Sequence, residues 1–409
     1  MRILHVNKFL YRRGGAESYM EDVAGLQRRA GHEVAFFGMD HPANISTQFA
    51  AAFPSYLQLH PPPPGLAGKA RAVGRMLWST SAAQGIEAVI DAFDPDVAHL
   101  HNIYHHLSPS ILGPLARRGV PTVMTLHDYK LACPSYHFLA HGRVCEACLG
   151  GHFHRALRRR CKDGSLAASA VLALELAIHT TIGAYSWISL FVCPSRFLAA
   201  KMAEAGVFPE RMRYGPHFFD PTSVEAADSP GRGVVYAGRL SAGKGVDVLI
   251  EALARLRIGH LDIAGEGPAR DWLVALAAER APGRVRFHGW LTKADLHALI
   301  RSTTVLAVPS RWYENQPMIV LESFGCGVPV VGTELGGLPE LIDPGVDGAL
   351  VPENDPAALA AALYPFLNDP TSAFDMGKAA RTKVEEQFSP ERHLHRLEEI
   401  YAEAAECVR

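Results

Sequence analysis

Short apolar runs alternate with helical segments along the chain, and this alternation occurs in two successive series. It is typical of parallel strands joined by helices, because each crossover helix returns the chain to the same edge of a sheet. We predict strands at 3–7, 33–38, 97–100, 122–126 and 190–193, and then at 234–237, 260–264, 284–288, 304–308, 328–331 and 349–351. The pattern therefore predicts an α/β protein with two doubly wound domains.

The 409 residues are enough for two such domains of ordinary size. Residues 216–233 are rich in Pro, Ser, Asp and Gly, which is the composition of a linker. We therefore expect a first domain at 1–215 and a second domain at 232–385. Residues 390–405 have the pattern of a charged amphipathic helix that follows the second domain.

Charge and hydropathy argue against several classes of protein. The formal net charge of −2 gives no reason to expect a nucleic-acid partner. The chain opens with MRILHVN, which is an apolar strand rather than a basic region followed by a cleavable apolar segment. The weakly charged stretch 165–192 is long enough for a membrane span, but Gly183 and Tyr185-Ser186 divide it into a buried helix and a strand. We expect a cytoplasmic protein.

The segment 311–339, RWYENQPMIVLESFGCGVPVVGTELGGLP, carries the most chemistry. A loop with Glu314 leads into a helix that Pro317 can begin, and Glu322 lies in the second turn of that helix. The free N–H groups and the dipole of a helix N-terminus favour an anion. Carboxylates beside a bound phosphate can accept hydrogen bonds from sugar hydroxyls. The segment therefore predicts a nucleotide-sugar site.

The pattern Glu-x7-Glu followed by Gly-Cys-Gly-Val-Pro-Val resembles the motif of glycosyltransferase family 4, whose members are retaining enzymes of the GT-B fold. The resemblance implies two Rossmann-like domains that face each other across a cleft. It also implies that Glu314 lies near the donor sugar and that Glu322 binds the nucleotide ribose. Further donor contacts are implied around the motif and in the glycine loops, at Gly15, Gly265, Asn315, Gln316, Pro317 and Met318.

A glycine-rich loop follows the first strand of the second series and contains Arg239 and Lys244. Two cations there can neutralise the charge that develops on a pyrophosphate leaving group, so we assign both a catalytic role. The resemblance implies that this pair replaces a catalytic metal, and we expect no such metal. The sequence Asp94-Pro95-Asp96 looks like the metal-binding Asp-x-Asp of other transferases, but it leads directly into a strand and has the composition of a turn.

Three loops of the first series carry the acceptor-side candidates; Gly-Gly-x-Glu and Thr-Leu-His-Asp resemble elements of the family, and strand alternation directs His101 and Asn102 toward the cleft. The Gly-Gly-x-Glu element follows the first strand, and His101-Asn102 follows the strand at 97–100. The Thr-Leu-His-Asp run ends at Asp128, and the resemblance implies that its histidine, His127, touches the donor sugar, where it could donate a hydrogen bond. The residues assigned to the acceptor side are Gly14, Glu17, His101, Asn102, Asp128 and Tyr129.

Four of the seven cysteines lie in one segment, at Cys133, Cys145, Cys148 and Cys161. Their spacing, C-x11-C-x2-C-x12-C, suits a tetrahedral zinc ion, and a cytosolic chain rarely keeps disulfides. A structural zinc site is therefore one interpretation. Free or incidentally paired thiols in an acceptor loop are the alternative. Some members of the family carry a similar insert at this place.

Basic and apolar residues are interleaved in two segments of the first half, at 153–162 and in GKARAVGRMLW at 68–78. Segments of this kind can meet anionic lipid headgroups or a lipid pyrophosphate. A solvated protein face is the simpler interpretation of each patch taken singly. Many members of the family glycosylate membrane-linked acceptors, so the resemblance implies contact with the inner face of the cytoplasmic membrane.

Together these patterns predict a retaining glycosyltransferase that moves a sugar from a nucleoside-diphosphate sugar to a hydroxyl acceptor. The resemblance implies a glycan or a lipid-linked acceptor, as in bacterial polysaccharide synthesis. A phosphorylase or a hydrolysing sugar-nucleotide epimerase of similar fold is an alternative enzyme, and a nucleotide-sugar or glycan-binding protein without turnover is an alternative of another class. A dinucleotide-dependent dehydrogenase fits less well, because no Gly-x-Gly-x-x-Gly follows the first strand.

Overall fold

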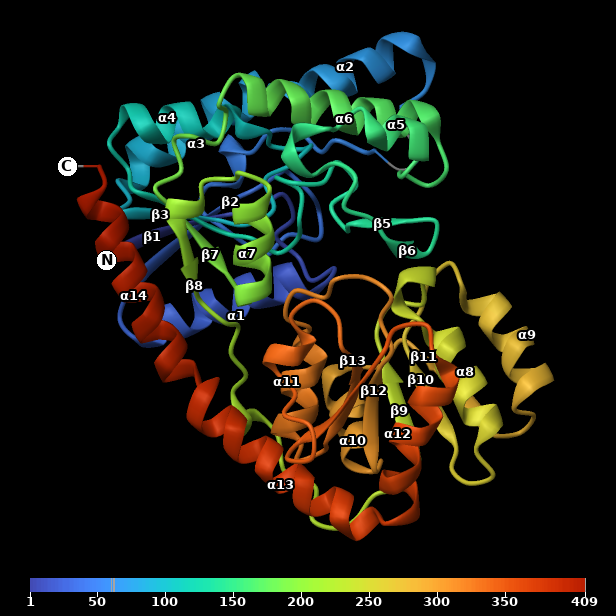
Figure 1. Cartoon of the computed structure of the whole chain (residues 1–409). Coiled ribbons are helices and arrows are strands. Elements are labelled where there is room, and N and C mark those ends of the chain that lie inside the picture. The colour runs from blue at the N-terminus through green and yellow to red at the C-terminus, as the bar shows by residue number, and fades with distance from the viewer. Residues whose placement is uncertain (60, 62, 409) are drawn as a thin grey trace.

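The computed structural model describes residues 1–59, 61 and 63–408. The chain forms two α/β domains that face each other, the first blue to green and the second mostly yellow to orange (Figure 1). Each domain contains a six-stranded sheet whose paired strands are all parallel. The prediction of two doubly wound parallel sheets is therefore confirmed.

The first sheet has the strand order β2-β1-β3-β4-β7-β8. Strands β3, β4 and β7 are buried at every position, because layers of chain cover both faces of the sheet, and this is why the sequence shows them as apolar runs. The elements of this half are β1 (Arg2–Val6), α1 (Gly15–Arg29), β2 (Glu33–Phe37), α2 (Gly65–Leu77), α3 (Thr80–Phe93), β3 (Val97–Leu100), α4 (Leu112–Arg117), β4 (Thr122–Thr125), β5 (Leu139–Ala140), β6 (Arg143–Val144), α5 (Arg155–Arg159), α6 (Leu166–Thr181), β7 (Leu190–Cys193), α7 (Arg196–Glu204) and β8 (Met212–Tyr214).

The second sheet has the order β11-β10-β9-β12-β13-β14. Its central strands β9, β10, β12 and β13 are likewise buried at every position. The elements are β9 (Val234–Ala237), α8 (Val246–Arg255), β10 (Leu261–Ala264), α9 (Arg270–Arg280), β11 (Val285–Gly289), α10 (Lys293–Arg301), β12 (Val305–Val308), α11 (Met318–Gly325), β13 (Val330–Thr333), β14 (Gly348–Val351), α12 (Pro356–Asn368) and α13 (Pro370–Gln387).

Three strands lie outside the predicted set. The edge strand β8 is only half-buried and has no apolar run, so the sequence pattern did not reveal it. Strands β5 and β6 form a short antiparallel hairpin inside the cysteine-rich insert. The hairpin lies on the cleft side of the first domain, opposite the second domain (Figure 1).

The last helix, α14 (Pro390–Glu406), leaves the second domain and packs against the first sheet. Its residues Leu397, Ile400 and Tyr401 join Ile3 and Val123 in one buried cluster. In Figure 1, α13 and α14 run in red along one side of both domains and bring the C-terminus close to the N-terminus. Two segments therefore connect the domains: the linker after β8 and the junction between α13 and α14.

Within the part of the chain that the structure describes, no helix is both long enough and apolar enough to cross a membrane. Helix α6 occupies much of the weakly charged stretch at 165–192, and its side chains Leu172, Glu175 and His179 are buried against the rest of the first domain.

Candidate active site

The strand order of each sheet reverses at an interior pair, β1 and β3 in the first sheet and β9 and β12 in the second. Ligands of open α/β sheets bind outside the carboxyl ends of the strands at such a point. The loops after β9 and β12 carry Arg239, Lys244 and Glu314, and the loops after β1 and β3 carry Lys8 and His101. The predicted residues Arg239, Lys244 and Glu314 therefore lie on loops where this architecture can place a ligand.

Glu314 is held as an anion inside the second domain. One oxygen, Oε1, lies 2.7 Å from Lys244 Nζ, and it also accepts hydrogen bonds from Ser310 Oγ at 2.6 Å and Trp312 Nε1 at 2.7 Å. The side chain is only 9% exposed. Burial by itself would raise the pKa of Glu314, but Lys244 and the two neutral donors hold it below its usual value. The other oxygen, Oε2, takes part in none of these contacts.

Two consecutive glycines fix the backbone of this loop. Gly336 has φ of +66°, and a Cβ there would lie 2.3 Å from the carbonyl oxygen of Glu314. A Cβ on Gly337 would lie 1.9 Å from the carbonyl oxygen of Asn315, and the Gly337 N–H donates to the Glu314 carbonyl at 2.7 Å. Only glycine fits these close approaches, so the Gly336-Gly337 pair positions the carboxylate.

Asn315 and Gln316 join the two domains across the cleft. Asn315 Nδ2 donates to the carbonyl of Leu126 at 2.9 Å, and its Oδ1 accepts from Ser195 Oγ at 2.9 Å. Gln316 Oε1 accepts from the backbone N–H of His217 at 2.6 Å. In this structure both side chains bridge the domains rather than standing free, a role that the sequence did not indicate.

Helix α11 begins directly after Pro317, and no side chain caps its N-terminus. Pro317 and Met318 are partly exposed, so the free N–H groups of the first turn are accessible to an anion. Glu322 lies in the second turn, 20% exposed, with Oε2 3.4 Å from Nε2 of the buried His297. The geometry matches the predicted combination of a helix N-terminus and a second carboxylate.

In the second domain, the glycine-containing loop after β9 contacts the glycine-containing loop after β10. Gly265 has φ of +135°, and a Cβ there would lie 1.9 Å from the carbonyl oxygen of Gly238. This contact leaves Arg239 exposed on the loop, with no salt bridge to any residue that the structure describes. Arg239 is therefore a free cation near the Lys244–Glu314 pair.

On the first-domain side, Lys8 lies between two acids and was not predicted. Burial raises the pKa of Glu17 and of Asp128, and in both cases the charge of Lys8 opposes the rise. Burial in turn lowers the pKa of Lys8, against the attraction of these two acids. A lysine immediately after the first strand, in the sequence Asn-Lys-Phe, was the available signal.

The other acceptor-side predictions have mixed outcomes. Gly14 and Gly15 are exposed at the start of α1. Asn102 is partly buried, and its Oδ1 has no hydrogen-bond partner among the described residues. Tyr129 is buried between Phe138 and Tyr313, and its hydroxyl also lacks a partner. Both atoms therefore have unused hydrogen-bonding capacity.

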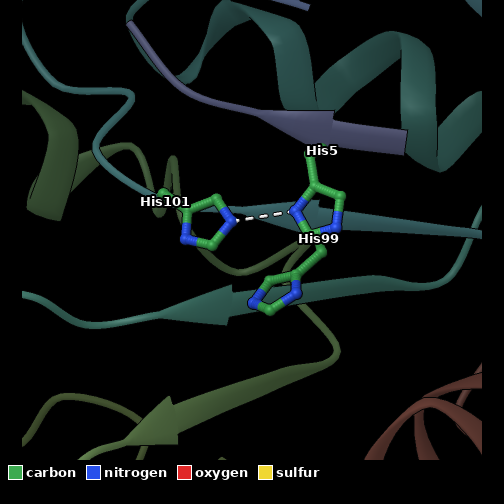
Figure 2. A group of neighbouring side chains, drawn as sticks. All are labelled: His5, His99 and His101. Carbon is green, nitrogen blue, oxygen red and sulfur yellow. Dashed lines mark hydrogen bonds between the residues drawn. The ribbon is translucent and has the colours of Figure 1, made fainter. Parts of the chain in front are cut away.

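His101 does not reach the cleft, contrary to the prediction, because it is fully buried behind His127. Nε2 of His127 lies 3.1 Å from Nδ1 of His101, and Nε2 of His101 lies 3.0 Å from Nδ1 of His5. Nε2 of His5 lies 2.7 Å from Oε1 of Gln27. Figure 2 shows the bond between His5 and His101. His127 is thus the last of three linked imidazoles.

The row continues beyond Gln27 through the C-terminal helix. Gln27 Nε2 donates to the hydroxyl of Tyr401 at 2.9 Å, which lies 2.6 Å from Nδ1 of His99. Nε2 of His99 lies 2.7 Å from Thr125 Oγ1. Residues from β1, β3, β4, α1 and α14 therefore share one buried polar network.

The direction of these bonds fixes the proton of His127. Burial lowers the pKa of His5 to about 4 and that of His101 well below its usual value, and burial with the charge of Lys8 lowers that of His127 to about 3, so each ring carries one N–H at neutral pH. Because Gln27 Oε1 only accepts, His5 carries its proton on Nε2 and accepts from His101. His101 then accepts from His127 Nε2–H. Nδ1 of His127 is left as an acceptor, and no hydrogen bond among the described residues uses it.

His5, His99 and His101 also form a group whose potential metal-ligand atoms lie within 4.8 Å of one another, and no second such group occurs among the described residues. All six of their ring nitrogens are hydrogen-bonded, and the His5 and His101 rings are stacked at 12°. Metal binding would require lone pairs that converge on one point. The arrangement fits a hydrogen-bonded row better than a metal centre.

The cysteine-rich insert contacts the donor loop directly. Glu146 accepts a hydrogen bond from the Tyr313 hydroxyl at 2.7 Å, and the ring of His137 stacks on Trp312 with centroids 4.6 Å apart. Burial raises the pKa of Cys148 to about 12, and the neighbouring thiols of Cys133, Cys145 and Cys161 add to that rise. The four cysteines therefore lie in one neighbourhood, although no three of the sulfurs come within 4.8 Å of one another.

Two family models match the chain. Residues 13–223, somewhat more than half of the chain, match the model of Glycosyltransferase Family 4. Residues 231–369 match the model of Glycosyl transferases group 1. The two matches cover the two domains in order.

Curated relatives match over part of their length. A D-inositol 3-phosphate glycosyltransferase of Catenulispora acidiphila is 30% identical over 68% of this chain and 65% of the relative. A glycogen synthase of Mycobacterium tuberculosis is 38% identical over 38% of each chain. The matches to these relatives thus cover from about two fifths to just under two thirds of the relatives' own length.

Solved structures resemble the whole chain. Sucrose-phosphate synthase from Thermosynechococcus elongatus superposes with a TM-score of 0.73 over 98% of both chains at 19% identity. HepE of Anabaena in complex with UDP-glucose superposes with a TM-score of 0.66 over 98% of both chains at 18% identity. At these identities the likeness establishes the two-domain fold and not the ligand.

Proposed function

The chain belongs to glycosyltransferase family 4, and from this premise we propose that it transfers a sugar from a nucleoside-diphosphate sugar to a hydroxyl acceptor with retention. The observation that supports this most is the ion pair between the partly exposed Lys244 and the buried Glu314, beside the uncapped N-terminus of α11. A fixed cation, a free helix N-terminus and an ordered carboxylate together suit a sugar diphosphate.

In this proposal, Lys244 and the exposed Arg239 neutralise the charge that develops on the leaving diphosphate, and the α11 N-terminus binds its oxygens. Glu322 holds the ribose, and the free oxygen of Glu314 holds the sugar. In this proposal Glu314 binds the sugar and is not a nucleophile, and the three donors at Oε1 fix the orientation of its carboxylate. The departing phosphate then takes the proton of the acceptor hydroxyl on the same face of the sugar. The interdomain bonds of Asn315 close the cleft and exclude water.

We assign His127 the role of hydrogen-bond acceptor for a hydroxyl of the donor sugar, because its Nε2–H is committed to His101. Monodeoxy and monodeoxyfluoro donors test this, since fluorine does not donate a hydrogen bond. At the contacted position both analogues should react equally poorly with the wild type, and His127→Ala should remove the penalty of both. A fluoro donor that reacts as well as the parent would show that His127 donates instead.

The donor site is tested by thermal stabilisation with UDP-, GDP-, ADP- and dTDP-sugars. One nucleotide should raise the melting temperature of the wild type, and Glu322→Ala should abolish the shift. A shift that persists in Glu322→Ala would contradict the ribose assignment. Product formation with that donor then separates a transferase from a binding protein, and release of free sugar without an acceptor would instead indicate a hydrolysing enzyme.

The cysteine-rich insert supports a structural zinc ion as a second part of the proposal. Four thiols in one neighbourhood, on segments that contact the donor loop, would hold Glu146 and His137 in place once a divalent cation draws the sulfurs together. Elemental analysis of anaerobically purified protein should find about one zinc per chain, and Cys145→Ser/Cys148→Ser should lose it. Metal-free protein of full stability would contradict this part.

We also propose that one face of the first domain rests on an anionic membrane where a lipid-linked acceptor is presented. Helices α2 and α6 lie side by side there, and Leu66, Leu174 and Ile182 are exposed on them or beside them (Figure 1). The exposed basic residues of the same helices and of α5 are Lys69, Arg71, Arg155, Arg158 and Arg159.

Sedimentation with phosphatidylglycerol vesicles tests the membrane face. Wild type should bind these vesicles and not zwitterionic ones, and Leu174→Glu should reduce binding at least tenfold. The matched control is Trp272→Glu, since Trp272 is an equally exposed apolar side chain on α9 of the second domain. Equal loss in both variants, or no binding of the wild type, would contradict a specific face.

A further inference from the structure

A cavity of about 460 Å³ lies at the junction of the two domains, next to both connecting segments. The linker contributes Pro216 and His217, and the α13–α14 junction contributes Phe388 and Ser389. None of the residues around the cavity is an aspartate or a glutamate. The remaining lining residues are Arg196, Tyr214, Gln387, Arg392, His393 and Arg396.

Three guanidinium groups give the cavity a positive charge. Arg392 forms no ion pair with any residue that the structure describes, and neither does Arg196, whose guanidinium lies 4.3 Å above the ring of Tyr214. Arg396 has one loose partner, Glu399, at 3.8 Å on the outer face of α14. Exposed arginines of this kind can bind an oxyanion with two parallel hydrogen bonds each.

The helix termini at the cavity differ in how they are neutralised. The N-terminus of α7 already holds a carboxylate, because Glu340 accepts from the backbone N–H groups of Arg196 and Phe197 at 2.8 and 2.6 Å. At the N-terminus of the 17-residue α14, the Ser389 hydroxyl accepts from Arg392 N at 3.4 Å, and the one acid of the first turn, Glu391, is exposed and does not line the cavity. The positive end of the α14 dipole therefore opens on the cavity without an anion.

One residue at the cavity has a buried polar atom without a partner. His217 is 5% exposed and lines the cavity, and its Nδ1 makes no hydrogen bond although it is buried. The neighbouring His393 has no spare nitrogen, since its Nδ1 contacts the Pro216 carbonyl at 2.7 Å and its Nε2 contacts the Tyr19 hydroxyl at 3.0 Å. An unpaired buried nitrogen of this kind is rare in folded proteins.

We propose that this cavity is a second anion site, distinct from the donor site, and that it binds a phosphate group between Arg196, Arg392 and Arg396. The volume exceeds that of one small ion and admits a phosphorylated metabolite. The cavity contacts both segments that connect the domains. A bound anion therefore restricts the movement of one domain relative to the other. The His217 ring stacks on His127 with centroids 5.6 Å apart, which places the bound anion one ring away from the donor side of the cleft.

The site is tested by isothermal titration with inorganic phosphate at constant ionic strength, with chloride as the reference salt. Arg392→Gln/Arg396→Gln should weaken phosphate binding at least tenfold. Arg255→Gln/Arg257→Gln, which removes two exposed arginines at the C-terminal end of α8, should leave it unchanged. A Lys244→Met background removes the phosphate affinity of the donor loop, and binding should persist there. Phosphate binding by the Lys244→Met variant does not depend on the donor loop, so this measurement tests the second site independently of the proposed transferase activity.

Hydrogen exchange locates the bound anion. Phosphate should slow exchange in peptides that cover residues 214–219 and 387–396, in the wild type and in the Lys244→Met background. Equal phosphate affinity in the double variant and the wild type, or protection confined to the donor loop, would overturn the proposal. Because all three arginines are exposed, the double variant is expected to fold, and circular dichroism checks this.

Discussion

Lowering the pH from 7.5 to 5 should strongly destabilise the first domain. Burial lowers the pKa of His5 and of His393 to about 4, from an ordinary value of 6.5. The unfolded chain therefore binds protons below pH 6.5 that the folded chain does not bind until about pH 4. The stability that these two groups contribute is complete above pH 6.5 and is lost as the pH falls toward 4.

The magnitude follows from the shift in pKa. At pH 5 each of these histidines lowers the free energy of unfolding by about 2 kcal/mol, from roughly 1.36 kcal/mol per pH unit below 6.5. His99, His101 and His217 act in the same direction, because burial also lowers their pKa values well below the usual range. His5 and His393 alone lower the free energy of unfolding by ~4 kcal/mol at pH 5. This is a large part of the roughly 5–15 kcal/mol that stabilises an ordinary domain.

Hydrogen exchange across a urea series, in peptides from β1 and β3, measures this free energy at each pH. A matched pair of variants on α14 isolates one group: His393→Gln removes a buried histidine, and His395→Gln removes one that is exposed. His393→Gln should reduce the dependence of stability on pH by ~1.4 kcal/mol per unit between pH 6 and 5, and His395→Gln should not. If the free energy of unfolding of the wild type stayed constant from pH 7.5 to 5, the conclusion that these histidines are buried as neutral imidazoles would be refuted.

Four further substitutions test the cleft. Lys244→Met and Arg239→Gln should each lower kcat by roughly a hundredfold to a thousandfold with a known acceptor, and a near-normal rate would contradict the proposed neutralisation of the diphosphate. Gly337→Ala places a methyl group 1.9 Å from the carbonyl of Asn315 and should abolish turnover, whereas Gly74→Ala, with nothing within 4 Å, should be neutral in rate measurements. Asn315→Ala removes two bonds between the domains and should raise hydrolysis of the donor relative to transfer, which assay of free sugar would detect.

The central strands could be predicted from the sequence because burial on both faces makes them continuous apolar runs. The loops after β9 and β12 could also be predicted, because closely spaced glycines and charged residues identify them in the sequence. Strand β8 could not be predicted, because an edge strand with Arg213 at its centre has no apolar signal.

The histidine row shows a different limit. His5, Gln27 and Tyr401 come from β1, α1 and α14, and the contact between Gln27 and Tyr401 joins residues 374 positions apart. A single sequence carries no signal for such a pairing, so His101 was assigned to the cleft when the fold places it behind His127. The proposed role of His127 as an acceptor could not be predicted from the sequence for the same reason, since its tautomer depends on Gln27.

The return of α14 to the first domain has a consequence for biosynthesis. Leu397, Ile400 and Tyr401 fill the cluster that contains Ile3 and Val123, so this apolar surface of the first domain stays uncovered while the second domain is still being translated. The first domain therefore cannot finish folding as an independent unit on the ribosome, although its strands are made first. A nascent chain arrested before residue 390 should remain open to chaperones and proteases, and completion of the last helix should end that vulnerable period.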